Sequence, residues 1–250
     1  MIQMKKLLTA LILTSAAAQV TAAEQIKFVT EATYPPFEMM DENNEFQGFD
    51  IDIARAVCTE LKAECSFANQ SFDSLIPSLK FRRYDAAIAA MDVTPARQKQ
   101  VDFSDIYYEN SAVLVAEKGK YNVVADLAGK AVGVQNGTSH QAYMTDTYAD
   151  EKVLLLNFPS YQKAFLDLKN GRINGVFSDS AVAHDWLTKH SGGNYETVGK
   201  AVTDAKYFGA GFAIAVRKGN TELLAKLNKG LQTIKANGTY DKIYAKYFAK

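Results

Sequence analysis

The segment 90–97 combines a predicted helix N-terminus with a nearby arginine. Thr94 is a plausible N-cap residue, and Pro95 suits the first helical position. Unpaired backbone N–H groups at a helix N-terminus favour an anion, and Arg97 can add a bidentate, charge-assisted pair. The segment therefore predicts a site for a carboxylate group, although an Arg97 in a surface salt bridge would show the same pattern.

Three acidic residues lie where predicted strands end. Glu31 ends the first predicted strand, Asp92 follows the strand that ends at Ala90, and Asp179 follows the strand that ends at Phe177. A carboxylate in such a place suits an ammonium group, but an aspartate there also commonly caps the next helix. The acids are therefore candidates for binding a cationic group, with helix capping as the open alternative for the two aspartates.

Two aromatic residues, Tyr34 and Phe72, lie at the same kind of loop. Rings in such loops hold a flat or cationic group by stacking and cation–π attraction worth ~0.5 to 2 kcal/mol each. The alternative is that both are ordinary core residues. Thr138 and Gln141 have the spacing of a capping box, which predicts another helix N-terminus beside the loops. Capping boxes occur in many helices, so this pattern alone is weak evidence of a site.

Two successive runs of alternating strand and helix patterns position these loops. Strand–helix–strand units of this kind imply two mainly parallel sheets with helices on their faces, and ligands of such sheets bind beyond the carboxyl ends of the strands. In the first run the expected strands are 26–30, 65–68 and 85–90, with helices over 50–62 and 73–81. In the second run the expected strands are 131–134, 153–158 and 175–177, with helices over 139–148, 161–170 and 181–187.

Two apolar extended stretches, 107–115 and 207–216, are expected to be strands that cross between two lobes. The last apolar periodic segment, 223–237, is expected to be a helix that packs back on the first lobe, because two crossings return the chain to its start. This organisation predicts a signal peptide over 1–22, a first lobe made of 23–110 and 204–250, and a second lobe made of 111–203.

The N-terminal segment has the layout of a secretory signal peptide. Lys5 and Lys6 precede an apolar run over 7–18, and small residues lead to a predicted cleavage after Ala22, with Ala23 as the alternative. The apolar run is shorter than the ~20 residues of a membrane-spanning helix. Removal of 1–22 takes away two lysines and no acids, which leaves 26 Lys+Arg against 28 Asp+Glu and a net charge of −2. This balance argues against nucleic acid as a partner.

Cys58 and Cys65 are the two cysteines of the sequence. An even pair in an exported chain favours a disulfide, here between the end of a helix and the following strand. A redox pair or half a metal site would be typical of C-x-x-C spacing or of nearby histidine ligands, and the sequence around the pair has neither.

Five segments carry a more specific pattern, in this order: Tyr34-Pro35-Pro36-Phe37, Gly48-Phe49-Asp50-Ile51-Asp52-Ile53-Ala54-Arg55-Ala56-Val57, Phe72-Asp73-Ser74-Leu75-Ile76-Pro77-Ser78-Leu79, Asp102-Phe103-Ser104 and Gly238-Thr239-Tyr240-Asp241-Lys242. In them the sequence resembles the family 3 solute-binding proteins, the polar amino-acid receptors of bacterial ABC importers. The resemblance covers essentially the whole chain after the signal peptide. It implies an α/β, two-lobed periplasmic-binding-protein fold of type II, in which the lobes close on one ligand about the crossing strands near Asn110 and Gly209.

The resemblance also implies roles for single residues. Arg97 would bind the α-carboxylate of an amino acid, helped by main-chain N–H groups around Asp92 and Ser139, and Asp179 would bind the α-ammonium. In the same way, Tyr34 and Phe72 would form the walls around the ligand side chain. Glu31 lies where receptors for cationic ligands place an acid, which favours arginine, since a carboxylate matches a guanidinium in charge and geometry. The full predicted set is Glu31, Tyr34, Phe72, Ala89, Ala90, Asp92, Arg97, Thr138, Ser139 and Asp179.

Four positions differ from the lysine/arginine/ornithine receptors of this family. Ala89, Ala90 and Asp92 stand where those relatives carry serines, so that Ala90 offers only its carbonyl and Asp92 adds a negative charge near the ammonium. His140 stands where they have glutamine, and we expect it at the rim of the pocket.

These patterns predict a periplasmic, monomeric substrate-binding component of an ABC importer that binds L-arginine and docks on an inner-membrane permease. No cofactor, metal or nucleic acid is expected, and no G-x-x-x-x-G-K-[ST] motif for ATP occurs. A broader binder of lysine, arginine and ornithine, or of histidine, is the alternative ligand specificity. The alternative class is a periplasmic dehydratase-type enzyme, for which the acid–base candidates are Glu31, Asp92, Asp179 and His140.

Overall fold

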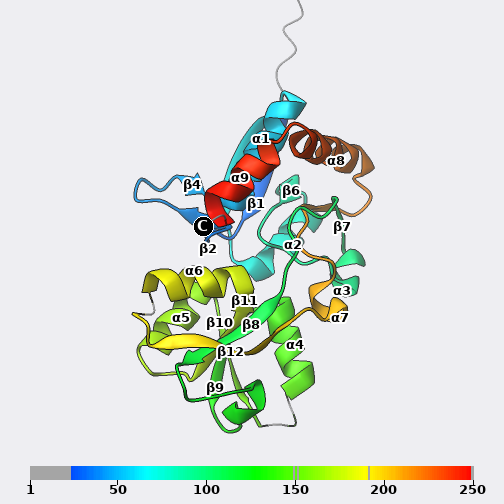
Figure 1. Ribbon diagram of the computed structural model, residues 1–250. Coiled ribbons are helices and arrows are strands. Elements are labelled where there is room, and N and C mark those ends of the chain that lie inside the picture. The colour runs from blue at the N-terminus through cyan, green and yellow to red at the C-terminus, as the bar shows by residue number, and fades with distance from the viewer. Residues whose placement is uncertain (1–23, 149, 151, 191, 249–250) are drawn as a thin grey trace, which may run out of the picture.

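A computed structural model describes residues 24–148, 150, 152–190 and 192–248 (Figure 1). The predicted signal peptide 1–22 lies outside these residues. The chain forms two lobes, each built on a five-stranded sheet with helices against it. The predicted two-lobed α/β fold is therefore confirmed.

In the first sheet four strands run in the same direction, and the fifth, β13, runs antiparallel to both of its neighbours. Helices α1 (Phe49–Leu61) and α2 (Phe72–Lys80) follow β1 and β5 in the chain. The apolar side chains that recur along α1 are buried, and α1 packs against α8 (Thr221–Ala236), so the late helix returns to the first lobe as predicted. In spatial order the strands are β5 (Glu64–Asn69), β1 (Gln25–Thr30), β6 (Ala86–Ala87), β13 (Ala215–Arg217) and β7 (Val101–Phe103).

The second sheet has the same plan. Four of its strands run in the same direction, and the fifth, β8, runs antiparallel to its neighbours β11 and β12. Helices α4 (Ser139–Tyr148), α5 (Tyr161–Lys169) and α6 (Ser180–His190) follow its parallel strands. In spatial order the strands are β10 (Leu154–Phe158), β9 (Ala131–Gln135), β11 (Gly175–Asp179), β8 (Ala112–Glu117) and β12 (Tyr195–Val202).

Shorter elements complete the chain. A small three-stranded sheet precedes α1, and helix α9 follows α8 and packs against both α8 and α1. The remaining bounds are β2 (Thr33–Tyr34), β3 (Glu38–Met40), β4 (Phe46–Gln47), α3 (Pro95–Gln98), the 3₁₀ helix η1 (Val124–Leu127), α7 (Ala205–Phe208) and α9 (Thr239–Phe248).

The predicted crossing strand over 207–216 is wrong in most of its length. The segment 205–208 is the helical turn α7, capped by the side chain of Asp204, and β13 begins only at Ala215. Gly209 explains the break, because it has a φ of +58° and a Cβ there would lie 1.9 Å from the Val93 carbonyl oxygen. The strand β12 was not predicted either. The two crossings between the lobes are therefore irregular segments that lead into β8 and β13.

The disulfide prediction is confirmed. Cys58 of α1 and Cys65 of β5 are bonded, with their Cα atoms 6.1 Å apart. In the part of the chain that the structure describes, no helix has the length and apolar character needed to cross a membrane. No group of three or more metal-ligating side chains occurs among those residues either.

Candidate ligand-binding site

The carboxyl ends of the strands of both sheets meet between the lobes, as the topology of such sheets requires. Side chains close this cleft so tightly that the cavity volume is about 10 Å³. Eight of the ten predicted residues line it. The lining is Glu31, Tyr34, Phe72, Ala90, Asp92, Gln135, Thr138, Ser139, His140, Tyr161 and Asp179.

Arg97 lies beside this cavity, on the short helix α3. The Thr94 hydroxyl oxygen accepts the Arg97 backbone N–H at 3.2 Å, which confirms the predicted cap. The guanidinium donates to the carbonyl oxygens of Asp92, at 3.0 Å, and of Gly137, at 3.2 Å, and its Cζ lies 5.1 Å from the centre of the Phe72 ring. Arg97 is buried, so the surface salt bridge is excluded. Burial lowers the pKa of the guanidinium, and the charges of Asp92 and Asp179 oppose this shift.

Asp179 ends β11 and points into the cleft from the other lobe. Its carboxylate accepts hydrogen bonds from the hydroxyl of Tyr34 and from the side-chain amide of Asn110. The Nε2 atom of His140 lies 3.0 Å from the same carboxylate. These described partners are cleft residues and not the first turn of α6, which favours the ligand-binding interpretation of Asp179 over helix capping.

Glu31 is buried at the far end of the lining, at the end of β1. It accepts a hydrogen bond from the Thr33 hydroxyl, and another from the side-chain amide of Gln135 at 2.9 Å. Burial raises the pKa of Glu31 to about 7, although both hydrogen bonds act to lower it. A cation that approached this carboxylate would favour its ionised form.

Asp92 lies between the lobes at the middle of the cleft. It accepts from the hydroxyl of Ser139 and, at 3.0 Å, from the side-chain amide of Asn110. Burial raises the pKa of Asp92 to about 7, and the negative charge of Asp179 adds to this effect, while His140 and Arg97 oppose it. Three acids, Glu31, Asp92 and Asp179, thus line the cavity, and the Arg97 guanidinium lies beside it.

Most of these contacts join one lobe to the other. Glu31 is hydrogen-bonded to Gln135, Tyr34 to Asp179, and Asp92 to Ser139, and the first member of each pair comes from the chain segment that forms the first lobe. An amino acid needs far more space than the cavity offers, since ligand pockets usually enclose ~300 Å³ or more. The lobes must therefore separate to admit a ligand, and the ligand must replace these contacts when they close again.

Two predicted placements need correction. His140 was expected at the rim, but only 2% of it is exposed, because the first turn of α4 faces the gap between the lobes and the ring packs on Tyr161, Phe177 and Phe208. The side chain of Ala89 packs into the core with Val29 and its neighbours, and it is not part of the described cavity lining.

Thr138 does cap α4, since its hydroxyl oxygen accepts the Gln141 N–H at 3.2 Å. The predicted capping box is only half formed. The Gln141 side chain accepts from the Gly137 N–H, at 2.8 Å, and so closes the loop one residue earlier than the box requires.

Three residues of the site were not predicted as ligand contacts: Gln135, Tyr161 and Asn110. Gln135 ends β9 and was marked only as the start of a strand-end loop. Tyr161 opens α5, and its ring lies 5.3 Å from that of Tyr34. Asn110 lies on a crossing segment and donates to both cleft aspartates. Its place as a polar residue at a strand end was the available signal for Gln135, whereas the other two depend on how the lobes meet.

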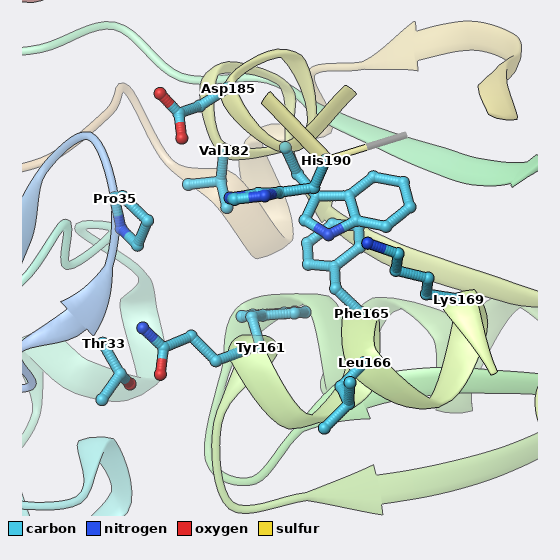
Figure 2. Close-up of a pocket in the computed structure, with 11 residues that line it drawn as sticks. Thr33, Pro35, Tyr161, Phe165, Leu166, Lys169, Val182, Asp185 and His190 are labelled. Atoms are coloured by element: carbon cyan, nitrogen blue, oxygen red, sulfur yellow. The ribbon is translucent and has the colours of Figure 1, made fainter. Parts of the chain in front are cut away.

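A larger groove of about 310 Å³ lies next to the cleft, between Pro35 and helices α5 and α6 (Figure 2). Tyr161 lines both spaces. The groove is mainly apolar, with the stacked rings of Phe165 and Trp186 inside it and Lys169 at its edge. Its chemistry suits a zwitterion less well than the cleft does, because most of its lining is apolar.

The raised pKa values make a prediction about the ligand-free protein. Glu31 and Asp92 stabilise the closed arrangement while they are neutral, and this stabilisation is lost as the pH rises through about 7. The radius of gyration from small-angle X-ray scattering should therefore be larger at about pH 8.5 than at about pH 5.5. The double variant Glu31→Gln, Asp92→Asn should stay compact at both pH values, and a wild-type radius that does not change with pH would contradict the prediction.

Comparison with known proteins agrees with this geometry. A model of the bacterial extracellular solute-binding proteins, family 3, matches residues 26–250. The ABC transporter arginine-binding protein 1 of Escherichia coli K12 is 54% identical over 245 residues, which is 98% of this chain and 99% of that protein. A Salmonella typhimurium periplasmic binding protein, solved to explain its high arginine specificity, is 48% identical with a TM-score of 0.86, and the match covers 90% of this chain and 100% of that one.

An ancestral amino-acid-binding protein, described as a precursor of cyclohexadienyl dehydratase, is also similar. It is 31% identical with a TM-score of 0.80, and the match covers 90% of this chain and 95% of that one. The two-lobed fold, the cleft between the sheets and the match along nearly the whole described chain lead to one conclusion: this chain belongs to the bacterial extracellular solute-binding proteins, family 3.

Proposed function

We propose that the chain is the substrate-binding component of an ABC importer and that it carries L-arginine between its two lobes. The observation that carries the proposal is the opposition of Arg97 and Asp179 across the closed cleft, one on the first lobe and one on the second. The names of the relatives support the same ligand, since the two most similar proteins described above bind arginine by name.

The ends of the amino acid match the two charged residues. Its α-carboxylate takes a bidentate pair from Arg97 in exchange for the carbonyls of Asp92 and Gly137, with the N–H groups at the start of α4 near Ser139 as further donors. Its α-ammonium replaces the Tyr34 hydroxyl and Asn110 on Asp179. Arg97 and Asp179 thus exchange their present partners for the two charged ends of the ligand, so closing the lobes on it leaves no buried charge unpaired.

The side chain of the ligand extends toward Glu31. The rings of Tyr34 and Phe72 line this part of the cavity, together with Thr138. The Glu31 carboxylate lies beside Gln135, where it can bind the end of the ligand side chain. A guanidinium is planar, always charged and rich in donors, so it can bond to the carboxylate and to the amide oxygen of Gln135 together. Of the cationic amino acids, arginine uses these acceptors most completely.

Replacement of Glu31 by glutamine should weaken arginine binding by about tenfold, because a charged hydrogen bond becomes a neutral one. Citrulline, the neutral isostere of arginine, should bind the variant and the wild type about equally. The exposed Glu45→Gln variant is the matched control for loss of one negative charge from the same lobe. Isothermal titration of both ligands tests this. An unchanged preference for arginine over citrulline would show that Glu31 does not bind the ligand guanidinium.

The same titration has a pH dependence. Arginine favours the ionised Glu31, whose pKa in the free protein is about 7, so wild-type affinity should rise as the pH increases from about 5.5 to about 7.5. The part of this rise that comes from Glu31 should be missing in Glu31→Gln.

The domain arrangement follows from this function. We infer a signal peptide over 1–22, a first lobe of 23–110 and 204–250 and a second lobe of 111–203, which close about the crossings near Asn110 and Gly209. The relatives named above include periplasmic binding proteins, which supports a periplasmic location. The closed monomer would then dock on an inner-membrane permease that supplies the energy of transport.

The proposal includes the absence of catalysis. The acids of the cleft are paired with donors that a cationic ligand would replace, and this arrangement suits capture without turnover. The experiment is a thermal-shift screen of the common amino acids, with recovery of each ligand for chromatography. Arginine at 1,000 times its dissociation constant should add ~4 kcal/mol of stability, or about 10 °C, and should be recovered intact. A larger shift with another amino acid would refute arginine as the ligand, and any product would indicate an enzyme.

A further inference from the structure

Behind the ligand site, the first lobe contains two acids that the proposed binding mode does not use. Glu38 of β3 and Asp50 in the first turn of α1 are both fully buried. Asp50 belongs to one of the segments that resemble the family, and neither acid lines the described ligand cavity. Buried acids are costly unless they are paired or neutral, so this pair needs an explanation.

Asp50 connects two parts of the binding machinery. Its Oδ2 atom accepts the backbone N–H of Ala90 at 2.7 Å and the hydroxyl of Tyr107 at 2.7 Å. Ala90 lines the ligand cavity and has a φ of +44°, a left-handed conformation that costs an alanine energy and has to be held in place. Tyr107 lies on the first crossing between the lobes, where its N–H donates to the Phe212 carbonyl of the other crossing, at 2.9 Å.

Glu38 explains how Asp50 keeps this position. The two carboxyl groups are close enough for each to shift the pKa of the other. Among the described residues, no donor reaches Oδ1 of Asp50 or either carboxyl oxygen of Glu38. Ionised carboxylates are acceptors only, so a hydrogen bond between the two requires a proton on one of them.

We propose that Glu38 and Asp50 share one proton, which keeps Asp50 in place to hold Ala90 at the ligand and Tyr107 on the crossing, so that loss of this proton in alkaline solution weakens ligand binding. The inference rests on the proposed function, since it concerns the regulation of that same site. Glu38 is a positioning residue, because it acts on the ligand only through Asp50 and Ala90.

The surroundings of the pair favour retention of the proton. Burial raises the pKa of Asp50 to about 7, and burial together with the neighbouring Asp50 charge raises the pKa of Glu38 well above its ordinary value. The other groups that face the pair are the carboxylates of Glu31 and Asp179 and the hydroxyl of Tyr107, and none of these supplies a positive charge. The stabilisation from the shared proton is thus present at acidic and neutral pH and is lost in more alkaline solution.

The test replaces Glu38 by glutamine, whose amide hydrogen takes the place of the carboxyl proton and is not lost at alkaline pH. In Glu38→Gln the side-chain amide donates to Asp50 at any pH, while the shape of the side chain is kept. The exposed Glu45→Gln on the same hairpin is the matched control. Isothermal titration with L-arginine is carried out at about pH 7 and about pH 9.5 for the wild type and both variants. Deprotonation of the ligand ammonium at the higher pH is common to all three and cancels in the comparison.

At about pH 7 the three proteins should bind arginine within about threefold of one another. Between the two pH values, the wild type and Glu45→Gln should lose about tenfold more affinity than Glu38→Gln, because only they lose the proton that holds Asp50. Equal pH profiles for the wild type and Glu38→Gln would overturn the inference.

A second measurement does not depend on the variant. The infrared spectrum of the wild type at about pH 8.5 should still contain the band of a protonated carboxyl group, when Glu31 and Asp92 are mostly ionised. Absence of this band would also overturn the inference. If none of the three proteins binds arginine at neutral pH, the proposed function fails, whereas the infrared band still reports the state of the pair.

Discussion

Replacement of Arg97 by alanine should abolish arginine binding in any practical concentration range. The guanidinium is buried, is held by two carbonyl oxygens and the ring of Phe72, and is the described cation nearest to the cavity. Without it the ligand carboxylate would be buried with main-chain donors alone. Removal of one partner of a buried ion pair costs about 3 to 5 kcal/mol, which corresponds to an increase in the dissociation constant of about 100- to 4,000-fold. Isothermal titration measures this change.

Two further variants make the result specific. Arg83→Ala removes an exposed arginine from the same lobe and should bind like the wild type. Arg97→Lys keeps the charge but not the bidentate geometry, so its affinity should be intermediate. Circular dichroism shows whether each variant is folded. Wild-type affinity in a folded Arg97→Ala protein would refute the assignment of Arg97 to the ligand carboxylate.

The second large effect is expected for Asp179→Asn. Asparagine preserves the shape of the side chain and still accepts from Tyr34, but it has no charge, and its amide hydrogens would oppose the ligand ammonium. We expect a loss of about 100-fold in arginine affinity by isothermal titration. The loss should also apply to any other α-amino acid that binds, because the ammonium is common to all of them.

The matched control is Asp185→Asn on α6, an aspartate outside the cleft whose carboxylate lies 2.6 Å from the Lys189 ammonium. It removes the same charge from the same lobe and should leave affinity within about twofold of the wild type. If Asp185→Asn and Asp179→Asn bind arginine equally well, the α-ammonium is bound elsewhere.

The fold could be read from the sequence where local patterns decide the structure. The apolar stripe of α1, the short β-rich runs and the glycines after helices predicted the strands and helices of the two α/β runs, apart from the short strands β2, β3 and β4. The crossing over 207–216 could not be predicted in this way, because its break depends on the approach of Gly209 to Val93, which is distant in sequence. In the same way, β12 is a strand because it pairs with β8.

The site shows the same limit. The predicted residues at strand ends come together because the topology of each sheet brings strand ends to one edge. The burial of His140 and the bond between Glu31 and Gln135 depend instead on how the two lobes meet, about which a single sequence contains little information. Asp50 was visible as part of a family motif, but its place beside Glu38 and its connection to Ala90 and Tyr107 appear only when the segments are folded together.

The most direct measurement is a crystal structure of the protein grown with L-arginine. The ligand is expected between the lobes, with its carboxylate in a bidentate pair with Arg97, its ammonium on Asp179 and its guanidinium at Glu31. An arginine bound in the cleft with the side chains of Arg97 and Asp179 both turned away from it would contradict the binding mode on which the proposed function depends.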